Sequence, residues 1–437
     1  MGPVSWLNLG SLAGCVGIAL LAWAAGGFRR PLPWRTVLGS SALLALLGAA
    51  VFWFPPARAF LLAINDLVIA VLDAGRAGAK FIFGPLALNP GETSPSGDRS
   101  IGFVLAAQVL PAVIFFSALM AALYHLRIMH PIVRLFAVLF HRTLKLSGAE
   151  ALAGSANIFV GVETAMTVRP YLERMTRSEL LNLITCGMAT TASTTLAIYI
   201  MFLRDSFPLI AGHLISASVI AIPAATMMSK LMLPETEVPV TLGRVPPIDE
   251  SGRETNTMSA LAAGSWDGLK LAAGIATLLI AVLGVVGIFD LALVKLTTPF
   301  AASLGGPVDF ARILGWLFTP LAWLLGLNGA DLHLAARLLG ERSVLTETVA
   351  YQHLGVLAAS HQLNPRTLLV LSYALCGFAH LASVGIFVGG TAALAPSRRG
   401  DLAGLGLRAL VAATLATLMT GAIAGAFYHG QQGILGL

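Results

Sequence analysis

Apolar segments long enough to cross a membrane recur along almost the whole chain, and short stretches of basic or turn-forming residues separate them. About 20 consecutive apolar residues in a helix cross the hydrocarbon core of a bilayer. Segments of this kind lie at 6–28, 37–54, 101–126, 180–202, 207–233, 269–289, 368–394 and 402–427. The pattern therefore predicts an all-α polytopic membrane protein with about eight transmembrane helices.

Two further segments have too many polar positions for a comfortable span. The polar and charged residues that interrupt the first of them are Asn65, Asp66, Asp73, Arg76 and Lys80. This pattern is typical of an amphipathic helix that lies in the membrane interface. We expect interfacial helices over 55–85 and 291–304, and an irregular loop over 89–100.

Two other segments are expected to enter the membrane and turn back on the same side. The first, 147–170, begins and ends near basic residues and would have its tip near Gly161. The second, about 310–354, would enter from the opposite side. Irregular backbone at this depth is tolerated only where it is buried in protein or faces a watery cavity. We therefore predict two re-entrant hairpins.

Positive charge gathers in the segments between spans. Arg29 and Arg35 follow the first span, and Arg127 to Lys145 follow the third. Because basic loops stay in the cytoplasm, the N-terminus is expected outside and the polar linker 234–257 inside. The composition, with 57% hydrophobic and 11% charged residues, agrees with a membrane protein. The net charge of +6 thus orients the helices and does not indicate a nucleic-acid partner.

An internal repeat relates the two halves of the chain. A Glu-Thr pair occurs at 163–164 and again at 347–348. A Cys-Gly-apolar-Ala-x-x-Ala-Ser signature follows each pair, beginning at Cys186 and at Cys376. An odd number of spans separates the two copies, so we expect them to have opposite orientations. Inverted repeats with broken helices that meet at the midplane are the architecture of secondary transporters.

The repeat suggests four parts. Residues 1–100 would form N-terminal helices and an interfacial helix that act as a scaffold. Residues 101–233 would be the first repeat with its hairpin, 234–257 the cytoplasmic linker, and 258–437 the second repeat with its hairpin.

The repeated segments bring polar side chains into apolar spans. An intramembrane carboxylate, here Glu163 or Glu347, is costly to desolvate and usually marks a substrate or ion pathway. Span seven adds His380 and Ser383. Span four adds a hydroxyl-rich core, formed by Thr185, Thr190, Thr191, Ser193, Thr194 and Thr195. These hydroxyls could serve a ligand or simply bond their own helix, and His380 could simply bond a neighbouring carbonyl.

Signatures of an enzyme are absent from the sequence. It has no His-Glu-x-x-His metal motif and no nucleophile spaced beside a base. The three cysteines lie in apolar context and form no disulfide framework. We therefore expect a transporter without a cofactor rather than a membrane hydrolase. A non-transporting gate or sensor of similar fold is the alternative.

Several blocks, in one order, resemble the concentrative nucleoside transporter family. They include QVLP at 108–111, ANIFVG at 156–161, VRPY at 168–171, PETE at 234–237, DGLKLA at 267–272, YALCGFA at 373–379 and LGLRAL at 405–410. The resemblance implies import of nucleosides across a bacterial inner membrane by cation symport. It also implies a homotrimer in which each protomer moves its own substrate site by an elevator-like shift.

The resemblance also implies which residues hold the nucleobase. Where the family usually reads Gly-Gln-Thr-Glu, this chain reads Gly161, Val162, Glu163 and Thr164. Val162 removes an amide donor and an acceptor from the base edge. Glu163 can only accept unless it is protonated, so it would favour bases that present N–H groups, such as guanine or cytosine.

The half of the site that holds the ribose is mostly kept. Glu347 corresponds to the family glutamate that binds the ribose hydroxyls, and Ser383 to its ribose-binding serine. His380 stands where the family usually has asparagine, and Thr195 of span four completes the set. We therefore expect a ribonucleoside, with the preferred base left open.

For coupling, the resemblance implies a sodium site. Asn157 and the hydroxyl of Thr190 would bind the ion, and Val160 and Thr191 would lend backbone carbonyls. Oxygen ligands of this kind suit Na⁺. Proton coupling is the alternative, because Glu163, Glu347 and His380 can all carry a proton.

Overall fold

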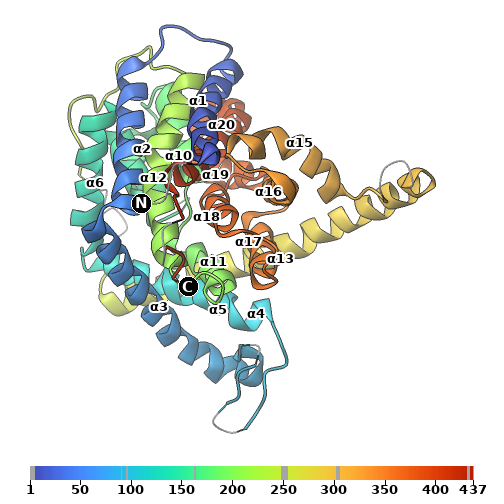
Figure 1. The fold of residues 1–437 in the computed structure, drawn as a ribbon. Helices are drawn as coiled ribbons and strands as arrows, with labels where there is room; N and C mark the ends of the chain where they lie inside the picture. The colour runs from blue at the N-terminus through green and yellow to red at the C-terminus, as the bar shows by residue number, and fades with distance from the viewer. Residues whose placement is uncertain are drawn as a thin grey trace.

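The computed structural model describes residues 5–89, 91–94, 97–161, 164–247, 254–301, 306–430 and 434–436. Within these residues every regular element is a helix, and the single β-pairing is an isolated bridge between Thr93 and Arg99. The helices form one bundle, from which the end of α13 (Thr257–Thr297) projects (Figure 1). The predicted all-α class is confirmed.

Three helices form the N-terminal part of the bundle. They are α1 (Trp6–Ala25), α2 (Trp34–Trp53) and α3 (Pro55–Phe83), and α3 leads into the short 3-10 helix η1 (Gly84–Ala87). The prolines at the start of α3 suit a first helical turn, where their missing N–H groups have no intrahelical partner to lose. The buried residues of α3 recur every seven positions on one face, as an amphipathic helix requires: Asn65, Leu72 and Ala79.

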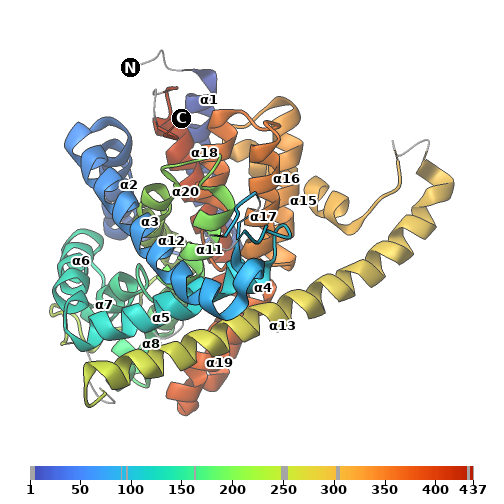
Figure 2. The ribbon, with the colours of Figure 1, turned by 90° about the horizontal axis from the view of Figure 1, so that it is seen from below.

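The helix α13 runs without a break for 41 residues. The interfacial helix expected over 291–304 is therefore wrong, because residues 291–297 continue α13. No proline interrupts the segment before Pro299, which lies in the 3-10 helix η2 (Thr298–Phe300). Figure 2 shows α13 crossing the face of the bundle as one rod.

Small residues hold α13 against α5 (Leu110–His125), which follows the single turn α4 (Leu105–Gln108). A Cβ on Gly264 would lie 2.8 Å from the Ser117 carbonyl oxygen, and one on Gly268 would lie 2.7 Å from the Cα of Ile114. Close approach of two helices through glycine is the usual packing mode inside membranes. The α5–α13 pair is therefore a compact unit beside the repeats.

The two repeats have matching elements. The first consists of α6 (Met129–Leu144), α7 (Gly148–Ala156), α8 (Thr164–Thr167), α9 (Arg169–Leu172), α10 (Arg177–Ala189), α11 (Ser193–Leu203) and α12 (Ile210–Met232). The second consists of α15 (Phe310–Leu324), α16 (Gly329–Val344), α17 (Glu347–Ala359), α18 (Pro365–Ala374), α19 (Leu381–Leu394), η3 (Pro396–Arg398) and α20 (Arg399–Phe427). Each has a helical hairpin, a helix broken in its middle and a long unbroken helix.

One helix of the first repeat was not anticipated. The basic stretch after α5 forms α6, whose buried residues follow a helical period: Met129, Val133, Ala137, Phe140 and Leu144. The basic side chains between them concealed this face in a search for apolar runs. The helix covers the first hairpin, because α6 packs along α7.

Seven helical segments of the described chain are long and apolar enough to cross a membrane. They are α1, α2, α4–α5, α10–α11, α12, α13 with η2, and η3 with α20. The remaining predicted span, span seven at 368–394, is present as α18 and α19, which are separated by a break and are each too short to count alone. Both hairpins are helix–turn–helix units, and their re-entrant placement remains a prediction.

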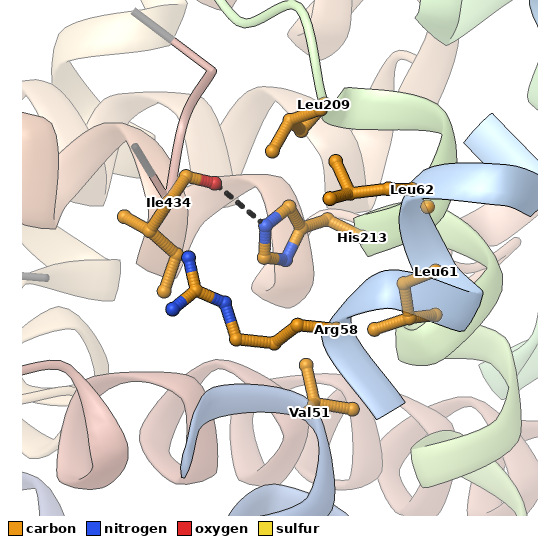
Figure 3. Close-up of a pocket in the computed structure, with 8 residues that line it drawn as sticks. Val51, Arg58, Leu61, Leu62, Leu209, His213 and Ile434 are labelled. Atoms are coloured by element: carbon orange, nitrogen blue, oxygen red, sulfur yellow. Dashed lines mark hydrogen bonds between the residues drawn. The ribbon is translucent and has the colours of Figure 1, made fainter. Parts of the chain in front are cut away.

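The C-terminal segment is attached to the bundle through His213 of α12 (Figure 3). Its Nε2 lies 2.9 Å from the Ile434 carbonyl oxygen, and its Nδ1 lies 2.9 Å from the Tyr373 hydroxyl. Since a carbonyl can only accept, Nε2 carries the proton and Nδ1 accepts from Tyr373. The ring, which is 7% exposed, thus links α12, α18 and the last described residues.

A buried charge pair ties the first hairpin to the rest of its repeat. Lys230 Nζ lies 2.6 Å from Glu150 Oε1, and the two side chains are 5% and 2% exposed. Lys230 also donates to the Ser178 hydroxyl, and Asn182 donates to Glu150. Ser147 and Glu150 form a capping box at the start of α7. The pair therefore fixes α7 to α10 and α12.

We predict that Lys230→Met strongly destabilises the protein, by about 3–5 kcal/mol, because it leaves the Glu150 charge buried without its partner. Thermal unfolding of the purified protein in detergent measures the effect. The control is Lys270→Met: Lys270 and its partner Asp267 are 75% and 66% exposed, and such a pair contributes about 0–1 kcal/mol. Equal shifts for the two variants would contradict the prediction.

Candidate functional site

Two broken helices touch at the centre of the bundle. The first break separates α10 from α11 at residues 190–192, and the second separates α18 from α19 at residues 375–380. The Phe378 N–H donates to the Thr190 carbonyl over 3.4 Å. The Thr191 hydroxyl lies 3.5 Å from the Cys376 sulfur. The repeated Cys-Gly signatures thus lie side by side in space.

Glycine is required where the two breaks approach. Gly377 has a φ of +150°, and a Cβ there would lie 2.7 Å from the Ala189 carbonyl oxygen and 2.8 Å from a Thr417 methyl group. Both the backbone conformation and the space therefore exclude larger residues. This contact explains the glycine of the second copy of the signature.

The turn of the first hairpin rests against the first break. The Ser193 N–H donates to the Phe159 carbonyl over 3.1 Å. The second hairpin meets the same region through aromatic stacking, since the rings of Tyr199 on α11 and Tyr351 on α17 have centroids 4.1 Å apart. Both hairpins therefore converge on the broken helices.

Glu347 is the first residue of α17 and is 4% exposed. Its Oε2 lies 3.0 Å from His380 Nε2 and accepts no hydrogen bond from the described residues, while its Oε1 accepts from the Thr348 hydroxyl over 3.4 Å. The start of a helix presents unpaired N–H groups that favour a carboxylate. A buried carboxylate with unused acceptor positions is suited to bind a ligand's hydroxyl groups.

His380 caps α19. Its Nδ1 accepts the Ser383 N–H over 3.3 Å, so in the neutral ring the proton lies on Nε2, which faces Glu347. The Ser383 hydroxyl donates to the His380 carbonyl over 2.6 Å, and its oxygen lone pairs remain as acceptors. The structure therefore brings Glu347, His380 and Ser383 together.

Two other predicted residues have hydroxyls that are bonded locally. Thr195 donates to the Ala192 carbonyl over 3.0 Å, and Thr164 donates to the Gly161 carbonyl over 2.7 Å. Their oxygen atoms can accept but no longer donate. Val162 and Glu163 lie outside the described residues.

Asn157 ends the first helix of the first hairpin and is 1% exposed. Neither its Oδ1 nor its Nδ2 has a hydrogen-bond partner in the described chain. A buried amide without partners is costly, and a bound ligand would relieve the cost. Thr190 donates its hydroxyl to the Cys186 carbonyl over 2.9 Å, so its oxygen is left as an acceptor.

A cavity of about 340 Å³ lies between the α5–α13 pair and the two broken helices. Val160 and Gly161 line it from the first hairpin, Phe378 lines it from the second break, and Ser383 from the first turn of α19. Asp267 of α13 places a carboxylate on the wall of the cavity. Its size is within the range of sites for small ligands. Glu347 and His380 are not on its wall.

Three residues near this centre were missed from the sequence. Phe378 lines the cavity, Tyr199 is fully buried and its hydroxyl has no hydrogen-bond partner among the described residues, and Arg342 is fully buried on α16. Phe378 could have been found as the variable apolar position of the repeated signature. Tyr199 and Arg342 gave no such signal, because their packing partners are distant in the sequence.

Hairpins and broken helices around a central site define a class of membrane transporter. Matches to models of known protein families identify the family within this class. "Na+ dependent nucleoside transporter N-terminus" matches residues 13–86, "Nucleoside recognition" matches 106–206, and "Na+ dependent nucleoside transporter C-terminus" matches 213–425. The chain belongs to the concentrative nucleoside transporter family, and it is a transporter rather than an enzyme.

Individual relatives agree over nearly the full length. The chain is 31% identical to nucleoside permease NupC of Helicobacter pylori, over 96% of this chain and 98% of that one. It is 32% identical to sodium/nucleoside cotransporter 1 of Mus musculus, over 98% of this chain and 66% of that one. Solved structures of CNTnw are 34% identical in sequence to this chain. One in an outward-facing state has a TM-score of 0.88 and covers 97% of this chain and 99% of that one. In an inward-facing substrate-bound state the TM-score is 0.86, over 96% and 98% of the two chains.

We predict that Gly377→Ala lowers thermal stability and abolishes transport, because a Cβ would push the two breaks apart. The strained backbone alone costs about 1–3 kcal/mol. Gly385→Ala is the control: it lies in the next helix, and a Cβ there meets nothing within 4 Å. A Gly377→Ala protein with wild-type stability and transport would contradict this interpretation.

Proposed function

We propose that this protein imports nucleosides across the inner membrane by sodium symport. The observation that carries the proposal is the Glu347 carboxylate, which is 4% exposed and lies where the second hairpin meets the second break. The names of two relatives support the proposal. The Helicobacter pylori relative is a nucleoside permease, and the mouse relative is a sodium/nucleoside cotransporter.

The protein would recognise the ribose through side-chain oxygen atoms that accept hydrogen bonds. Glu347 accepts hydrogen bonds from the sugar hydroxyls, and Ser383 offers a further oxygen beside it. Losing one such bond would leave a buried carboxylate short of a partner, at a cost of about 1–3 kcal/mol. The nucleobase would extend toward the first hairpin, where Val160 and Gly161 line the cavity.

Sodium would bind beside the first hairpin. The Asn157 side chain supplies an amide oxygen without another partner, and Thr190 supplies a hydroxyl oxygen. The carbonyl oxygens of Val160 and Thr191 complete the proposed ligand set. Hard oxygen ligands of this kind fit Na⁺. No group of three His, Cys, Asp or Glu side chains in the described chain could instead hold a metal ion.

Alternating access would move the repeats against the α5–α13 pair. The cavity lies near the end of α5, at Tyr124, and near the start of α13, at Gly264 and Asp267. By the distribution of basic residues, these helix ends face the cytoplasm and the N-terminus lies outside. With this orientation, a cavity at these helix ends would open toward the cytoplasm. The long exposed face of α13 would pack against further copies in a homotrimer.

Proton coupling is the second candidate, and the contact of His380 with Glu347 favours it. A proton shared by these two groups could be released when substrate binds. Uptake driven by a pH gradient in sodium-free buffer would establish this mechanism instead.

Counterflow in proteoliposomes tests the function itself. Vesicles that contain the protein and are loaded with unlabelled uridine, cytidine or guanosine should accumulate the labelled nucleoside in sodium buffer. A gate or sensor of the same fold would not exchange label. Absence of exchange with every nucleoside would overturn the proposal.

We predict that Glu347→Gln lowers nucleoside affinity at least about tenfold, since the amide loses charge and one acceptor. Binding of labelled nucleoside to the purified protein measures it. The control is Glu237→Gln in the polar linker, whose side chain is exposed. Unchanged affinity in Glu347→Gln would remove Glu347 from the site.

We predict that Asn157→Ala raises the sodium concentration needed for half-maximal uptake at least several-fold, because an ion ligand is lost. Ser383→Ala should instead weaken nucleoside binding and leave the sodium dependence near wild type. Uptake measured over a sodium series, with choline as replacement, separates the two effects. An identical sodium dependence in Asn157→Ala and the wild type would place the ion elsewhere.

The base preference follows from the altered motif at 161–164. Glu163 as an acceptor favours nucleosides with an exocyclic amino group, so guanosine and cytidine should compete better than uridine, whose base edge offers one N–H between two carbonyl oxygens. Competition by uridine above both of them would contradict this assignment.

A further inference from the structure

Arg342, in the last turn of α16, is the largest fully buried side chain of the described protein. Its Nη1 donates to the Ala374 carbonyl over 3.0 Å and also to the Thr417 hydroxyl. Ala374 is the last residue of α18, at the start of the second break. A cation there also stabilises the negative end of the helix dipole.

Within the part of the chain that the structure describes, the guanidinium forms no ion pair with a carboxylate. Its Nε and Nη2 have no hydrogen-bond partner among the described residues. The neighbouring Glu341 is engaged elsewhere: its Oε1 lies 2.9 Å from Arg337 Nε, and its Oε2 lies 2.7 Å from His353 Nδ1. A buried cation needs a compensating negative charge nearby, and Glu341 is already shared with two partners.

Of the described residues, Glu347 is the next carboxylate along the chain that is buried like Arg342. It follows five residues later, across the turn at 345–346 that joins the end of α16 to the start of α17. The other titratable groups that face this pair are His380, Tyr199, Tyr351 and Cys376. His380 is neutral when it caps α19, because its Nδ1 must be free to accept from Ser383. The tyrosines and the thiol are neutral acids when buried.

We propose that Arg342 is the fixed counter-charge of Glu347 and keeps this carboxylate ionised in the substrate-free site. It acts as a positioning residue. Only an ionised carboxylate offers all of its lone pairs to the hydroxyls of a sugar, whereas the protonated acid uses one oxygen as a donor. The link to substrate rests on the proposed function, and the pairing of the two charges does not.

The first experiment measures binding of labelled cytidine and uridine to the purified full chain from mildly acidic to mildly alkaline pH. Wild type and Arg342→Lys should give similar, flat profiles. In Arg342→Met, Glu347 takes up a proton at acidic pH, so affinity should fall at least about tenfold there and recover as the pH rises. A flat profile in Arg342→Met overturns the proposal. Arg337→Met, on the same helix, is the control and should resemble wild type.

The second experiment needs no substrate. Thermal unfolding is compared for Arg342→Met, Glu347→Gln and the double variant. If the two charges compensate each other, the double variant is more stable than the sum of the single shifts. Arg342→Met combined with Glu341→Gln is the control pair and should show no such recovery. Additive shifts for Arg342 and Glu347 overturn the proposal.

The two experiments also separate the two hypotheses. If the wild type binds no nucleoside but the stability cycle shows coupling, the proposed function fails and the counter-charge stands. If the Arg342→Met protein does not fold, the counter-charge proposal predicts that the double variant Arg342→Met with Glu347→Gln does fold. Failure of both to fold, while Glu347→Gln alone folds, overturns it.

Discussion

The junction of two broken helices is the constraint on which the structure depends. A helix that unwinds inside a membrane exposes backbone N–H and carbonyl groups that lipid cannot satisfy. Here the breaks satisfy each other, through the Phe378 N–H and the Thr190 carbonyl, and the first hairpin adds the bond from Ser193 to Phe159. Gly377 allows this approach because it has no Cβ. The site is thus built from backbone that must be buried in protein.

Buried charge is handled differently in the two repeats. In the first, Glu150 and Lys230 are in direct contact, and several polar side chains complete their hydrogen bonds. Such a network is fully satisfied and serves to hold α7 in place. In the second, one oxygen of Glu347 and two nitrogens of Arg342 have no hydrogen-bond partner in the described part of the chain. Incomplete pairing is costly, and it is found where a ligand is expected.

The long helix α13, packed on α5, borders the cavity opposite the broken helices. It contacts α5 through glycines and leaves most of its length exposed. The cavity lies on the seam between this pair and the broken helices, so that a shift of the repeats would change the walls of the cavity together. As the fixed side of such a shift, a single continuous helix would be better suited than a span joined to an interfacial helix, because it has no bend at which it could flex.

The sequence by itself determined the membrane class and the family, and it marked the two breaks. Apolar length follows from bilayer thickness, and the repeated Cys-Gly signature marks both breaks directly. Tertiary structure decided the rest. Whether residues 291–297 continue α13 depends on packing and not on local pattern, and the basic helix α6 shows its apolar face only at helical spacing. The approach of His380 to Glu347, the stacking of Tyr199 on Tyr351 and the burial of Arg342 join residues far apart in the chain. Such contacts arise only when the folded backbone brings the elements together, because a side chain's partners across a bundle leave no periodic mark in the sequence.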